Sequence, residues 1–290
     1  MSYQSFMFRL HAGRNDRKRD RAIALPEGIT ECRNITYGDH GKWNRLDVYY
    51  PMGTTAPLPT IVSIHGGAYV YGTKEQYRRY CMDLARRGFS VVNFSYRLAP
   101  EWKFPAPLED TNAVLEWVCR NAATYHLDPQ RLFLVGDSAG AQIASQYAAI
   151  ATNPDYAAHF CFSVPDIHIR GVGLNCGVYD AMKLAAGSFR FIAKDYLGSH
   201  ISADDLRLKV LEHITPQFPP AHITTACHDF LRDCAKPMAD YLVGNGVKAL
   251  MNCYGEDADE TVGHVFHINI SLPDATKCND DQCDFFKSML

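Results

Sequence analysis

Short apolar runs alternate with helix-like stretches along most of the chain. Runs typical of buried strands lie at 60–64, 90–96 and 131–135, and helical patterns follow each of them at 74–87, 108–125 and 139–152. Further strand-like runs lie at 169–178, 221–226 and 247–254, and 273–290 has the pattern of a closing helix. This alternation predicts an α/β fold, in which a mostly parallel, twisted sheet is flanked by helices on both faces.

Two parts of the chain depart from this alternation. Residues 29–50 have the pattern of an antiparallel strand pair, ended by the proline-rich link 51–59. Residues 180–220, with helical patterns at 182–196 and 203–213, are too long for a simple crossover. We expect this insertion and about residues 1–30 to form a helical cap. Because the link is too short to divide domains, residues 1–290 are predicted to be a single domain.

Charge and composition narrow the classes of partner. The 290 residues are 47% hydrophobic, which predicts a large core. Their net charge of -3 favours small neutral or weakly charged substrates over nucleic acid or a membrane. The mixed-sign run 14–21 is typical of a solvated helix face. Neither a secretory signal nor a bilayer-length apolar run is found, which predicts a cytoplasmic protein. The ten scattered cysteines favour free thiols.

The run ending at residue 135 leads into a candidate nucleophile. Gly136-Asp137-Ser138-Ala139-Gly140 fits G-x-S-x-G, the tight strand-to-helix turn that exposes a serine hydroxyl. The glycines suit positions that crowd their neighbours, and the helix start after Ser138 directs free amides toward an anion. A glycine-rich turn, such as a phosphate cradle, would have the same pattern.

A serine nucleophile needs a base and an acid, and in this type of fold both come later in the chain. Asp229 follows the strand-like run 221–226, and His264 lies between the last strand and the closing helix. Asp233 and Asp180 are alternative acids, and His267 is an alternative base. His264 and His267 have a spacing that could bind a metal, but no matching ligands lie nearby, so no metal is predicted.

These motifs together resemble the hormone-sensitive-lipase-like (bacterial family IV) esterases of the α/β-hydrolase superfamily. The resemblance rests on His65-Gly66-Gly67 after a strand, the motif around Ser138, and the late Asp229 and His264. The stretches 96–101 (YRLAPE) and 104–110 (FPAPLED) also match this group. The chain departs from it at Ala68, where a third glycine is usual, and at Phe230, where proline is usual.

The resemblance implies that Ser138 attacks an ester carbonyl, His264 moves the proton, and Asp229 orients the imidazole. It further implies that the amides of Gly66, Gly67 and Ala139 hold the oxyanion, and that His65 stabilises the loop. Ala68, Tyr69 and Asp137 are candidates for the substrate pocket. Tyr71 and Phe189 are further candidates, although aromatic residues near a core more often serve packing.

The implied function is a cofactor-free serine carboxylesterase that cleaves small or short-acyl esters. A deacetylase of acylated saccharides is a plausible specialisation, and an amidase or peptidase would use the same three groups. A non-catalytic small-molecule receptor on the same fold is a different class, disfavoured because all three catalytic residue types are present. A homodimer is compatible with the resemblance, but no residue requires one.

Overall fold

The computed structural model describes residues 1–179, 190–198, 202 and 204–290. Its centre is an eight-stranded sheet in the order β1-β2-β4-β3-β5-β6-β7-β8. The strands are β1 Ile29–Thr36, β2 Arg45–Pro51, β3 Thr60–Ile64, β4 Ser90–Phe94, β5 Leu132–Asp137, β6 Ile169–Asn175, β7 Ala221–Ala226 and β8 Ala249–Tyr254. β2 pairs antiparallel with β1 and β4, and the pairs from β4 to β8 are parallel. The predicted mostly parallel sheet and its antiparallel pair are confirmed.

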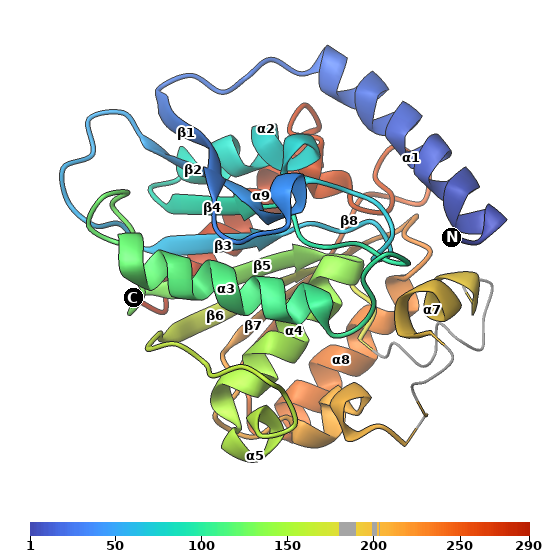
Figure 1. Ribbon diagram of the computed structural model, residues 1–290. Helices are drawn as coiled ribbons and strands as arrows, with labels where there is room; N and C mark the ends of the chain where they lie inside the picture. The colour runs from blue at the N-terminus through green and yellow to red at the C-terminus, as the bar shows by residue number, and fades with distance from the viewer. Residues whose placement is uncertain (180–189, 199–201, 203) are drawn as a thin grey trace.

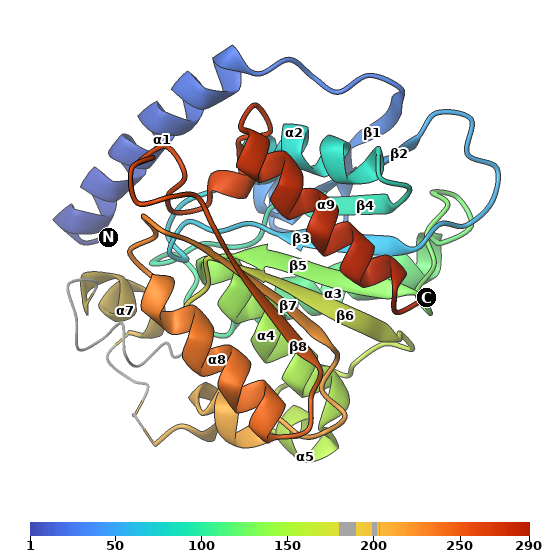
Figure 2. The ribbon, with the colours of Figure 1, turned by 180° about the vertical axis from the view of Figure 1, so that it is seen from behind.

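Helices cover both faces of the sheet (Figures 1 and 2). One face carries α2 Lys74–Ala85 and α9 Pro273–Lys287, and the other carries α3 Ala106–Asn121, α4 Ala139–Thr152 and α8 Arg232–Gly244. Strand β5 supplies both cores, because Leu132 and Leu134 pack on the α3–α4 side while Phe133 and Val135 pack on the α2–α9 side. This two-sided burial explains why the parallel strands are continuous apolar runs.

The described part of the insertion after β6 is less helical than predicted. Helix α7 Arg190–Leu197 overlaps the end of the predicted helix 182–196, whose first part is outside the described residues. The predicted helix at 203–213 is wrong: over the described residues 204–213 the chain forms the 3₁₀ turns η2 Leu206–Leu208 and η3 Val210–His213 in place of an α-helix. Asp205 accepts a hydrogen bond from the Arg207 amide, a local contact that favours short turns over a continuous helix. The remaining short elements are α5 Pro154–Ala157, η1 Gly41–Asn44 and η4 Phe266–Ile268.

Helix α1, Tyr3–Ala22, is attached to the rest of the protein by polar groups and by the packing of Phe8 on Tyr71. Ser2 and Ser5 both donate hydrogen bonds to the Asp195 carboxylate of α7. Farther along, Arg9 donates to the carbonyls of residues 70 and 99, and Arg19 donates to the carbonyl of residue 76. Ser5 is its one fully buried side chain. No helix in the described part of the chain is both long enough and apolar enough to span a bilayer.

Candidate active site

Ser138 occupies a strained turn between β5 and α4. Its backbone has φ 52° and ψ -117°, a conformation that non-glycine residues rarely adopt, and its amide donates to the Asn175 carbonyl at 2.9 Å. A Cβ on Gly136 would lie 2.2 Å from the Gly140 carbonyl oxygen, and one on Gly140 would lie 2.1 Å from that of Ile64. Both positions therefore require glycine, as the sequence motif predicts.

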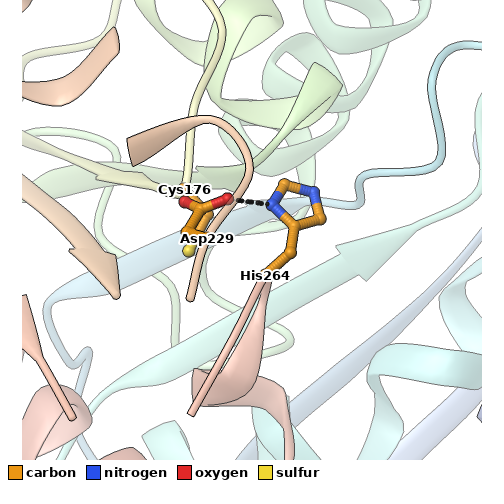
Figure 3. A group of neighbouring side chains, drawn as sticks. All are labelled: Cys176, Asp229 and His264. Carbon is orange, nitrogen blue, oxygen red and sulfur yellow. Dashed lines mark hydrogen bonds and ion pairs between the residues drawn. The ribbon is translucent and has the colours of Figure 1, made fainter. Parts of the chain in front are cut away.

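His264 and Asp229 form a hydrogen-bonded acid–base pair (Figure 3). His264 Nδ1 lies 2.7 Å from Asp229 Oδ1, and the carboxylate also accepts bonds from the Leu231 amide and the Thr225 hydroxyl. An isolated parallel bridge between residues 228 and 263 holds their two loops together. Burial alone would raise the pKa of Asp229, but the hydrogen bonds and the charge of His264 outweigh it and lower that pKa. The pair can therefore orient and stabilise a protonated imidazole.

Ser138 and His264 open onto the same cavity, which has a volume of about 450 Å³. Asp229 lies behind the imidazole and does not line it. Apolar side chains dominate the walls, and α1 and α7 contribute to them. The apolar lining includes Phe8, Ala12, Ala68, Ala139, Val178, Ile192, Phe230, Leu231, Val265, Phe266, Ile268 and Leu272. Such a cavity is large enough for a small ligand.

The loop after β3 has an unusual run of left-handed backbone. Gly67, Ala68 and Tyr69 have φ of 113°, 54° and 60°, and a Cβ on Gly67 would lie 2.1 Å from the Tyr71 carbonyl oxygen. The expectation that Gly66 offers a free amide is not supported, because this amide already donates to Tyr77 Oη at 2.9 Å.

Three other amides remain available in this region. Within the described residues, the amides of Gly67, Ala68 and Ala139 make no hydrogen bond, and all three residues line the cavity. Ala139 is the first residue of α4, where backbone N–H groups lack partners within the helix. The cavity therefore has donors on two sides of the Ser138 turn.

A buried network supports the loop from behind. Tyr77 Oη accepts from the Gly66 amide and donates to Asp137 Oδ2 at 2.8 Å. Burial raises the pKa of Asp137 to about 7, although the Tyr77 hydrogen bond opposes this rise. His65 Nδ1 lies 2.7 Å from the Gly66 carbonyl oxygen, and the imidazole stacks on the Tyr96 ring with 4.0 Å between the ring centroids. Burial lowers the pKa of His65 to about 4. A neutral His65 is suited to holding the loop and not to moving protons.

The other pocket candidates differ in their environment. Tyr69 lines the cavity but is almost fully buried, stacked on Tyr196 at 3.8 Å and hydrogen-bonded to Gln142, so it serves packing. Tyr71 also lines the cavity and donates to Asp16 of α1. Phe189 lies outside the described residues. The contribution of Tyr77 was missed, because nothing in the sequence links it to the loop that it supports.

The alternative catalytic groups lie elsewhere. His267 is fully buried against Tyr80 and does not line the cavity. Its pKa is lowered to about 3, and burial is the largest cause. Asp233 is exposed in the first turn of α8, and Asp180 lies outside the described residues. His264, not His267, therefore carries the carboxylate partner.

One cluster has the residue types of a metal site. Ligand-type atoms of Cys176, Asp229 and His264 lie within 4.8 Å of one another (Figure 3). The Asp229 and His264 atoms are already joined to each other by the 2.7 Å hydrogen bond. The arrangement is thus that of an acid–base pair with a buried thiol beside it.

Comparisons with known proteins identify similar sequences. The sequence profile of a family described as "alpha/beta hydrolase fold" matches residues 61–268. The chain is 31% identical to carboxylesterase NlhH of Mycobacterium tuberculosis, over 77% of this chain and 72% of that protein. It is 39% identical to a probable isoprenylcysteine alpha-carbonyl methylesterase of Oryza sativa subsp. japonica over 39% of this chain, but spans only 27% of that relative's length.

A solved structure extends the likeness to almost the whole chain. Esterase B from Lactobacillus rhamnosis superposes with a TM-score of 0.90 over 99% of this chain and 94% of that one, at 24% identity. At this identity the likeness concerns the fold alone. It includes the parts of the chain outside residues 61–268.

Proposed function

Because this chain belongs to the α/β-hydrolase family, we propose that it is a serine carboxylesterase acting on small or short-acyl esters. The observation that carries the proposal is the convergence of a strained Ser138 and an Asp229-paired His264 on one cavity. The esterase names of its relatives support the reaction class. The cavity of about 450 Å³ supports a small substrate.

In the proposed mechanism, Ser138 Oγ forms a bond to the ester carbonyl carbon while His264 takes the hydroxyl proton. The C–O bond to the alcohol then breaks, and the imidazolium returns the proton to the leaving oxygen. Water repeats the sequence on the acyl enzyme and releases the acid. Asp229 stays ionised throughout, which is consistent with its lowered pKa.

The negative charge on the carbonyl oxygen needs donors that are free before the reaction. The amides of Gly67 and Ala139, with that of Ala68, are suited to this role, whereas the Gly66 amide is engaged with Tyr77. The start of α4 adds the positive end of its dipole. Each such donor contributes about 2.7–4 kcal/mol to lowering the barrier.

We further propose that α1 and the insertion at 180–220 act as the cap over this cavity. The inner side of α1 lines it through Phe8, Ala12 and Arg19, and α7 contributes Ile192. The hydrogen bonds from Ser2 and Ser5 to Asp195 join the two cap segments.

The proposal is tested with p-nitrophenyl esters from acetate to laurate, a matched amide and acetylated saccharides. We expect acetate and butyrate to be cleaved fastest, and Ser138→Ala and His264→Ala to abolish turnover. His267→Gln is the matched control and should retain activity if the protein remains folded by circular dichroism. Absence of turnover by the folded wild type on every ester would refute the proposal and favour the receptor function.

A further inference from the structure

Helix α1 has two sides with different chemistry. At about 100° per residue, its cavity-lining residues fall on one side of the helix. Eight of its exposed residues fall within an arc of about 120° on the opposite side, and the exposed Gln4, His11, Asn15 and Ala22 lie on the flank between the two sides. The eight residues are Tyr3, Phe6, Met7, Leu10, Arg14, Arg17, Lys18 and Arg21, which we call the outer face. The outer face therefore runs the length of the helix.

The first half of the outer face is apolar. Tyr3, Phe6, Met7 and Leu10 are exposed by 74%, 45%, 43% and 39% respectively. In Figures 1 and 2, α1 lies at the periphery of the molecule in both views. A contiguous set of exposed large apolar side chains is typical of a surface that contacts another apolar phase.

The second half is basic and has no counter-charge. The two acidic residues of α1, Asp16 and Asp20, are both paired with Arg19. Elsewhere on the surface, arginines such as Arg33 and Arg78 lie against glutamates. The four cations of the outer face instead make no ion pair or hydrogen bond with any described residue, and they border one shallow depression.

We propose that the outer face of α1 binds the surface of a lipid bilayer that contains anionic phospholipids. The four cations would lie at the lipid phosphates while the apolar half inserts between the headgroups. A nucleic acid would complement the cations but not the four apolar side chains. From the net charge of the whole chain we expected no membrane partner, yet the unpaired cations are concentrated on one side of one helix.

This arrangement would place the cavity close to the bilayer, because the inner side of the same helix lines the cavity. The binding itself requires no catalysis, so it can be tested independently of the proposed esterase activity. If both hold, the enzyme would act on esters that partition into an anionic membrane surface.

The test is cosedimentation of the full chain with vesicles of phosphatidylcholine, with or without phosphatidylglycerol. A variant with Arg14→Gln, Arg17→Gln, Lys18→Gln and Arg21→Gln removes the basic half. Each cation near an anionic surface strengthens binding roughly fivefold, so we expect the variant to bind several hundredfold more weakly. The control variant removes four exposed cations elsewhere on the surface, with Arg86→Gln, Lys103→Gln, Lys236→Gln and Lys248→Gln, of which Lys236 is paired with Asp240.

The control variant should bind like the wild type, and salt should weaken the binding of both. A second variant, Phe6→Ser with Leu10→Ser, should also lose binding while its charge is unchanged. Circular dichroism melting establishes that each variant is folded. Because these side chains are exposed, we expect little change in stability.

Five outcomes would overturn the proposal. The first three are no binding of the wild type to phosphatidylglycerol vesicles, equal binding to both vesicle types, and equal loss in the two charge variants. The fourth is a wild-type dimer, seen by size exclusion with light scattering, that the Phe6→Ser/Leu10→Ser variant converts to monomer, which would make a second copy the occupant. Binding to duplex DNA in place of vesicles would also contradict it.

Discussion

The pKa of Asp137 leads to a prediction about stability. This carboxyl precedes Ser138 in the chain, is 3% exposed and has its pKa raised to about 7 by burial. In the unfolded chain an aspartate titrates near 3.9. Between these values the folded protein holds a proton that the unfolded chain releases, so raising the pH destabilises the folded state. The loss begins near pH 4 and levels off above about pH 7.

The size of the effect follows from the two pKa values. A difference of about three units corresponds to roughly 4 kcal/mol across the full window, and to roughly 2–3 kcal/mol between about pH 5 and 8. The Asp137→Asn variant has no ionisable group at this position, so its free energy of unfolding should lack this fall with pH. We therefore predict that the free energy of unfolding of the wild type, minus that of Asp137→Asn, falls by roughly 2–3 kcal/mol over this range.

The measurement is urea unfolding followed by circular dichroism at several pH values. Subtracting the variant removes the contribution of ionisable groups that do not interact with residue 137. Tyr77→Phe provides a second comparison: because the Tyr77 hydrogen bond lowers the pKa of Asp137, its loss should extend the fall to higher pH. A difference between the wild type and Asp137→Asn that stays constant with pH would refute the reasoning that burial dominates at this site.

Three further predictions concern the site. Gly140→Ala places a Cβ 2.1 Å from the Ile64 carbonyl oxygen, so we expect destabilisation by about 3 kcal/mol or more, measured by thermal melting; an unchanged melting temperature would contradict this. Asp229→Asn should lower kcat about 10⁴-fold in p-nitrophenyl acetate assays without unfolding the protein, and a loss below tenfold would exclude its role. Phe230 lies 4.2 Å from His264 between ring centroids, so Phe230→Leu should lower kcat about twofold to fivefold; an unchanged kcat would show that the ring does not stabilise the imidazolium.

The sequence by itself determined the elements with strong local signals. The buried parallel strands were identified because both of their faces are covered, which requires continuous apolar runs. The Ser138 turn was identified because its geometry excludes a side chain at residues 136 and 140. The chain order of Ser138, Asp229 and His264 was also informative, since each follows a strand at the same edge of the sheet. By contrast, the short turns at 206–213 depend on local polar contacts that hydrophobic periodicity does not register.

Only the tertiary structure decided which backbone amides and charged side chains already have a hydrogen-bond or ion-pair partner. Gly66 and Gly67 look equivalent in sequence, but Tyr77 occupies one amide and leaves the other available. The mixed charges of 14–21 looked balanced, but Arg19 pairs with both aspartates and leaves four cations unpaired. Hydrogen bonds and ion pairs saturate their partners, and those partners are chosen by distance in space. The chemistry that remains available is therefore a property of the folded chain and not of its local sequence.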